Sequence, residues 1–155
     1  MPAIQSPEEA VLQESMGRLE AAFLAPVVSG ELNSWVENLR HALDEFGPAW
    51  VAYVKNVLHP QYAEIAKTDS DLLDRVGKLI QADKELLNEF YSFQERVREL
   101  SRRAQQVDKK EYKTVDQRED LEKAGIALTV KIKKQQAAAA VWLNEATYRE
   151  RGTGD

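Results

Sequence analysis

The chain has 155 residues, a formal net charge of −5 at pH 7 and no cysteine. This length fits one domain, and a composition of 43% hydrophobic and 30% charged residues is typical of a globular rather than a disordered protein. The negative charge argues against a nucleic-acid partner, and the lack of cysteine excludes disulfides, thiolate metal sites and thiol nucleophiles. No run is apolar enough to span a bilayer and the N-terminus lacks the apolar core of a secretory signal, so we expect a cytoplasmic protein without a membrane partner.

The first predicted helix begins at Ser6, which can cap it, with Pro7 at the first helical position and Glu9 completing a capping box. We expect an N-terminal helix over residues 6–24, because Pro26 follows. This amphipathic segment would either cover one end of the molecule or dock on a partner.

Two shorter helices are predicted next. An apolar face runs from residue 31 to residue 46, and Gly47-Pro48 is expected to end that helix and open the next one. Pro60 lies inside this third helix, which it should kink or split, because its ring removes a backbone donor and clashes with the preceding turn.

The stretch from Asp71 to about Gln106 is the longest predicted helix and forms one wall of the molecule. Its apolar residues recur with helical period, at Leu72, Val76, Leu79, Ile80, Leu86, Leu87, Phe90, Phe93, Val97 and Leu100. Asp83 lies on the same face as these residues. A charged carboxylate on an apolar face must be paired, hydrogen-bonded or protonated.

A capping box at residues 114–117 begins the last predicted helix, which runs to about Tyr148 and leaves a frayed tail at 149–155. No alternating segment or hairpin turn indicates a strand. The sequence therefore predicts one all-α domain over residues 1–155: an up-and-down four-helix bundle at 31–148, whose last two helices form a long antiparallel hairpin, with an additional N-terminal helix.

Three further polar residues share the apolar faces with Asp83. Gln61 is in phase with the third helix, Gln135 is in phase with the last helix, and Gln136 flanks it. In a bundle these residues from three helices meet near one layer. Two interpretations stay open: a hydrogen-bonded polar layer in the core, or a ligand or metal site.

Both histidines are predicted to face outward. His41 and Glu45 have the i, i+4 spacing of metal ligands, but His41 falls opposite the apolar face of its helix. His59 falls opposite the line through Trp50 and Val57. The basic residues from Arg96 to Lys113 are expected to complement the negative pole of the long helix rather than to bind nucleic acid.

Residues 79–87 (LIQADKELL) and the later segment IKKQQAAAAVWLNEA resemble the third and last helices of the hemerythrin-like family. This resemblance implies a four-helix bundle in which Asp83, and Gln135 or Gln136, occupy positions of ligand histidines. Val57 and Gln61 would replace a histidine and a glutamate. The resemblance thus implies a family member whose di-iron site is lost.

From these observations we expect a non-enzymatic helical-bundle protein that binds or scaffolds, through a protein partner or self-association, with no cofactor. One alternative is an iron- or oxygen-binding protein with the reduced ligand set Asp83, His41 and Glu45. Another is a small-molecule binder with its pocket around Asp83.

Overall fold

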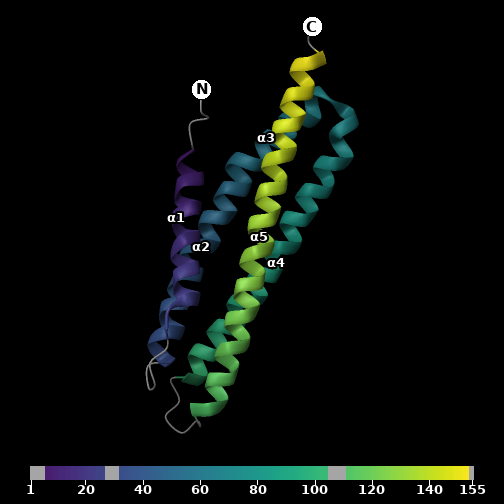
Figure 1. Cartoon of the computed structure of the whole chain (residues 1–155). Helices are drawn as coiled ribbons and strands as arrows, with labels where there is room; N and C mark the ends of the chain where they lie inside the picture. The colour runs from purple at the N-terminus through teal and green to yellow at the C-terminus, as the bar shows by residue number, and fades with distance from the viewer. Residues whose placement is uncertain (1–5, 27–31, 105–110, 154–155) are drawn as a thin grey trace.

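The computed structural model describes residues 6–26, 32–104 and 111–153, and within the last range the side chains of 117–148. The protein is all-α, without a strand in these ranges (Figure 1). Its helices are α1 (Pro7–Leu24), α2 (Leu32–Tyr53), α3 (His59–Thr68), α4 (Leu73–Ala104) and α5 (Glu111–Thr153). A π-helical turn, η1 (Val54–Leu58), joins α2 to α3, and a 3₁₀ turn, η2 (Ser70–Leu72), precedes α4.

The four longer helices, α1, α2, α4 and α5, pack lengthwise against one another. α1 lies along α2, α2 lies along α4, and α4 lies beside α5 over most of its length (Figure 1). α4 and α5 are antiparallel, because Lys131 contacts Glu89 whereas Gln135, further along α5, contacts Asp83. α1 also contacts α5. It therefore packs along the long axis of the molecule instead of covering one end.

Two clusters of apolar side chains form the core. The larger cluster joins α1, α2, α4 and the first half of α5, and contains the stacked and tilted rings of Phe46, Trp50 and Phe90. The smaller cluster joins α3 to the start of α4 and the end of α5, around Tyr62 and Trp142. On α4 the smaller cluster ends at Leu79 and Ile80 and the larger one begins at Leu86. Asp83 therefore lies at the junction of the two clusters.

The predicted start of the first helix is confirmed. The Ser6 hydroxyl accepts a hydrogen bond from the backbone N–H of Glu9 at 3.1 Å, and Pro7 is the first helical residue. The helix ends at Leu24, before Pro26.

The predicted helix end at Gly47-Pro48 is wrong, because α2 continues through both residues to Tyr53. A proline inside a helix costs about 3 kcal/mol, which packing must offset. Here Phe46 and Trp50 are buried on either side, and a Cβ at Gly47 would come within 3.0 Å of the Phe90 ring. The glycine lets this ring approach the helix, so tertiary packing outweighs the local helix-breaking signal.

Pro60 was predicted to kink or split its helix, but the backbone stays helical from α2 through η1 into α3. In η1 the N–H of His59 bonds to the carbonyl of Val54, five residues back, and α3 then begins with Pro60 in its first turn. A first-turn proline needs no intrahelical donor. The π-helical turn thus provides the start that the proline requires.

The ends of the last helix differ from the prediction. α5 begins at Glu111, so the capping box predicted at 114–117 lies inside the helix, and residues 105–110 lie outside the described part. At the other end α5 runs to Thr153, so the predicted frayed tail is helical up to that residue. Among the described helices none combines the length and the apolar character needed to cross a membrane.

Candidate functional site

Asp83 is the most deeply buried carboxylate in the described part of the chain, with 5% of its surface exposed. One of its oxygens, Oδ1, accepts a hydrogen bond from Gln135 Nε2 at 3.3 Å. The same amide reaches the carbonyl of Leu79 at 3.5 Å. The structure thus brings Asp83 and Gln135 together across α4 and α5.

His59 lies on the other side of Asp83. Its Nε2 atom is 3.7 Å from Asp83 Oδ2, which is too long for a hydrogen bond but close enough for electrostatic attraction. The prediction that His59 faces outward is therefore wrong: its side chain is only 33% exposed and it stands beside the buried carboxylate. The cause is η1, which holds more residues per turn than an α-helix and shifts the phase of everything that follows.

Two polar atoms of this pair have no hydrogen-bond partner within the protein. Asp83 Oδ2 and His59 Nε2 are both buried as atoms, and both lack a partner. Most buried polar groups in folded proteins are hydrogen-bonded, and an unsatisfied one costs about 1–3 kcal/mol. The pair therefore offers an acceptor and a ring nitrogen to whatever occupies the space between and beside them.

A cavity of about 260 Å³ lies beside this pair, between the α2–η1 segment and α4. Its lining consists of Trp50, Val51, Val54, Lys55, His59, Asp83, Lys84 and Leu87. Burial orders these residues by depth. Buried Trp50 and Asp83 form the floor, half-buried apolar side chains and His59 form the walls, and exposed Lys55 and Lys84 stand at the rim. The cavity is thus apolar along its walls, with a polar end inside and positive charge at the mouth.

Burial raises the pKa of Asp83 above the ordinary value of 3.8, because the charged form loses its hydration. The hydrogen bond from Gln135 and the nearby His59 oppose this shift. Tyr62, on α3, has its pKa raised by burial and by the charge of Asp83. Its hydroxyl is likewise buried without a partner. Tyr62 therefore lies near enough to Asp83 to feel its charge, although it does not line the cavity.

The two other glutamines predicted for this layer do not bond to Asp83. Gln61 is exposed and lines a wider hollow of about 550 Å³ between α3 and α5, so its predicted inward position is wrong. Tyr62, one residue later, holds the core position instead and is completely buried. Gln136 is half-buried, and its Nε2 atom has no hydrogen-bond partner.

The alternative metal set does not converge. His41 and Glu45 are exposed on α2, as their helical phase predicts, and Glu45 is bonded to Arg18 of α1 at 2.8 Å. Within the described residues no group of three or more histidine or acidic side chains could hold a metal ion. Asp83 has His59 beside it, not His41 or Glu45.

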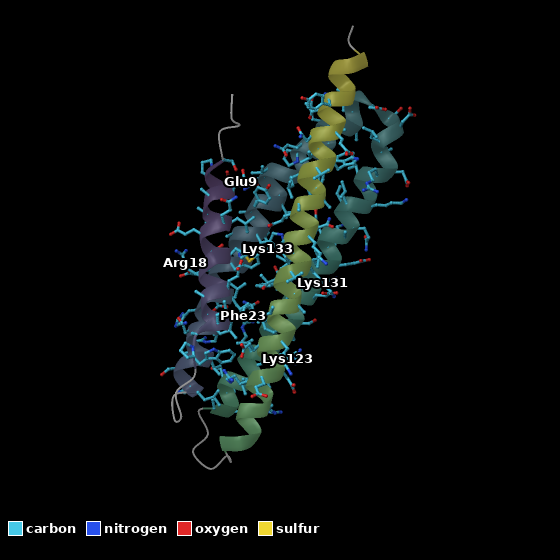
Figure 2. The ribbon with its side chains drawn as sticks, viewed as in Figure 1. Glu9, Arg18, Phe23, Lys123, Lys131 and Lys133 are labelled. Atoms are coloured by element: carbon cyan, nitrogen blue, oxygen red, sulfur yellow. The ribbon has the colours of Figure 1, made fainter. Side chains whose placement is uncertain are left out.

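The basic residues near the end of α4 are largely engaged in ion pairs. Arg98 contacts Asp44 of α2 at 3.6 Å, and Arg103 contacts Glu99 at 3.3 Å. On α5, Lys131 and Lys133 (Figure 2) contact Glu89 of α4 and Glu20 of α1. The predicted basic patch also includes Lys109, Lys110 and Lys113, whose side chains lie outside the described part.

Sequence reasoning missed His59, Trp50 and the two lysines as members of one site. Trp50 was expected in the core, where it lies, but nothing local shows that a cavity adjoins it. The one available signal was Pro60: a proline late in a helical pattern marks a place where the phase can change. Comparison with known proteins adds nothing to this site, since no family model, curated protein or solved structure matches the chain.

Proposed function

We propose that this protein is a non-enzymatic up-and-down helical bundle that binds a small molecule in the cavity beside Asp83. The observation that carries the proposal is the unsatisfied pair at its inner end, Asp83 Oδ2 and His59 Nε2. Small-molecule sites are concave, mostly apolar and provided with a few polar groups that orient the ligand, and this cavity has that character.

The size of the cavity limits its occupant. Typical ligand pockets measure about 300–1,000 Å³, so a cavity of about 260 Å³ lies just below that range and suits only a small molecule. Nothing in the arrangement supplies a nucleophile activated by a base, so binding rather than turnover is the proposed role. We keep a cytoplasmic location, with no nucleic-acid or membrane partner, as part of the proposal on the grounds of composition and charge.

Kinship with the hemerythrin-like family also remains a proposal. It is supported by Asp83 and Gln135, which face each other across α4 and α5 at the two positions that the resemblance equates with ligand histidines. In this view the ligand cavity occupies the place of a lost di-iron site.

A metal-binding role is the second candidate, because one observation favours it. His59 Nε2 and Asp83 Oδ2 are 3.7 Å apart, a separation that two ligands of one ion can have. Two protein ligands are fewer than metal sites usually provide. Metal analysis of untagged protein tests this candidate: a stoichiometric transition metal that is lost in both Asp83→Ala and His59→Ala would establish it.

A thermal-shift screen with neutral, anionic and cationic fragments tests the small-molecule proposal. The blocking variant is Leu87→Trp, which fills the cavity from its α4 wall, and the matched control is Leu73→Trp at an exposed position on the same helix. We expect compounds that raise the melting temperature of the wild type and of Leu73→Trp but not that of Leu87→Trp. If no compound separates the two variants, the proposal fails.

A further inference from the structure

The polar end and the mouth of the cavity together indicate the class of ligand, provided that the proposed binding function holds. We propose that the cavity binds a small carboxylate whose apolar, aromatic body carries a hydroxyl group at its far end. Three features carry this inference: the distance between Asp83 and His59, the apolar walls, and the two lysines at the rim.

A hydroxyl group matches the inner end because it both donates and accepts a hydrogen bond. Asp83 Oδ2 accepts, and a neutral imidazole protonated at Nε2 donates. These atoms are 3.7 Å apart and neither is accessible to water, so the partly exposed His59 ring must rotate to admit one oxygen atom at about 2.7–2.9 Å from each of them. A hydroxyl at this point satisfies both groups that the protein leaves without a partner.

Asp83 is held in position to receive this group. Its other oxygen is fixed by Gln135 of α5, which leaves Oδ2 directed to the His59 side. Gln135 is thus a positioning residue for the site and makes no contact with the ligand itself.

The walls favour a flat apolar body. Trp50 lies at the floor, and Val54 of η1 and Leu87 of α4 also line the cavity. An indole ring at the floor provides a surface on which an aromatic ring can stack or pack edge-on.

The mouth favours an anionic group. Lys55 of η1 and Lys84 of α4 are both exposed, line the cavity, and have no ion pair with another described side chain. A carboxylate on the outer end of the ligand would meet both of them. A cationic ligand would instead be repelled by the two lysines at the mouth. Its attraction to Asp83 would also be weak, because burial raises the pKa of that carboxyl and so disfavours its charged form.

Isothermal titration calorimetry with four related compounds tests this inference. The probe is 4-hydroxyphenylacetate; phenylacetate lacks the hydroxyl, 2-(4-hydroxyphenyl)ethanol lacks the carboxylate, and tyramine replaces the carboxylate with an amine. We expect the probe to bind tightest, with phenylacetate weaker by about 10-fold or more because two hydrogen bonds are lost. We expect the alcohol to bind about 2- to 5-fold more weakly than the probe, as exposed ion pairs contribute little, and tyramine to bind least.

Variants at the rim separate a binding role from a structural one. The double variant Lys55→Gln/Lys84→Gln should lower the affinity for the probe about 2- to 5-fold but leave the affinity for the neutral alcohol unchanged. The control, Lys67→Gln with Lys78→Gln, makes the same change of net charge at exposed positions outside the cavity lining and should leave both affinities unchanged. Asp83→Leu should reduce the difference in affinity between the probe and phenylacetate, because only the hydrogen bond from His59 to the hydroxyl remains.

The outcomes distinguish the ligand class from the binding function. If the alcohol or tyramine binds as tightly as the probe, and Leu87→Trp abolishes that binding, the cavity is a binding site but the proposed class is wrong. If none of the four compounds binds and the fragment screen finds no compound sensitive to Leu87→Trp, the binding function fails as well.

Discussion

At the scale of single residues, Asp83 has one carboxylate oxygen with a hydrogen-bond partner and one without. Gln135 satisfies Oδ1, whereas Oδ2 faces His59 across 3.7 Å without a hydrogen bond. Stability alone does not explain this arrangement, since a buried carboxylate that is incompletely paired costs free energy. The binding role that we propose for Asp83 accounts for this arrangement, and it has consequences for stability.

Replacing Asp83 with leucine should leave the free energy of unfolding at pH 7 unchanged or raise it, by up to about 2 kcal/mol. The substitution removes a buried charge, while the side chains of Gln135 and His59 are each partly exposed and can turn toward solvent. Urea denaturation measures the effect. A loss of several kcal/mol would show that Asp83 is a structural element of the core.

The gain from Asp83→Leu should depend on pH. Because the pKa of Asp83 in the folded protein lies above 3.8, the folded state holds this proton to higher pH than the unfolded chain does. The wild type therefore loses stability, relative to the variant, as pH rises from below 4 through the raised pKa. Denaturation at several pH values measures this effect, and a His59→Gln background repeats the measurement without the neighbouring imidazole. A gain that shrinks as pH rises would contradict the raised pKa.

At the scale of the helices, the limits of sequence reasoning are visible on either side of η1. On α4 and α5, which are uninterrupted, the apolar period located Asp83 and Gln135 on facing surfaces, and they do contact each other. Past η1 the same period is displaced by one residue, so Tyr62 is buried where Gln61 was expected. A π-helical turn depends on how the following segment packs, and the sequence shows only that Pro60 disturbs the helix.

Helix contacts also make two glycines respond oppositely to the same change. A Cβ at Gly125 of α5 would lie 2.2 Å from the Phe23 ring of α1 and 2.9 Å from the Phe93 ring of α4, whereas a Cβ at Gly77 meets nothing within 4 Å. Gly125→Ala should lower the free energy of unfolding by about 1–3 kcal/mol through overpacking. Gly77→Ala should raise it by about 0.5–1 kcal/mol through helix propensity. Thermal or urea unfolding compares them, and equal effects would rule out close three-helix packing at Gly125.

At the scale of the whole molecule, the candidate site lies where the two apolar clusters meet. The larger cluster holds α1, α2, α4 and α5 together, and the smaller one anchors α3 and the end of α5. Tyr53 and Val54 pack against both clusters. Their junction is where an α-helix changes into a π-helical turn and where a cavity remains beside α4. The π-helical turn and two of the buried polar atoms without a partner, Asp83 Oδ2 and His59 Nε2, therefore lie at this junction.

The two histidines of the chain allow the most direct test of binding at this junction. His59 lines the cavity, and His41 is exposed on α2 and serves as an internal control. In long-range ¹H–¹⁵N spectra of the imidazole rings, titration with 4-hydroxyphenylacetate, or with a compound from the fragment screen, should shift the His59 Nε2 signal to saturation. The His41 signals should stay in place. Unchanged His59 signals with every compound that raises the melting temperature would contradict the account.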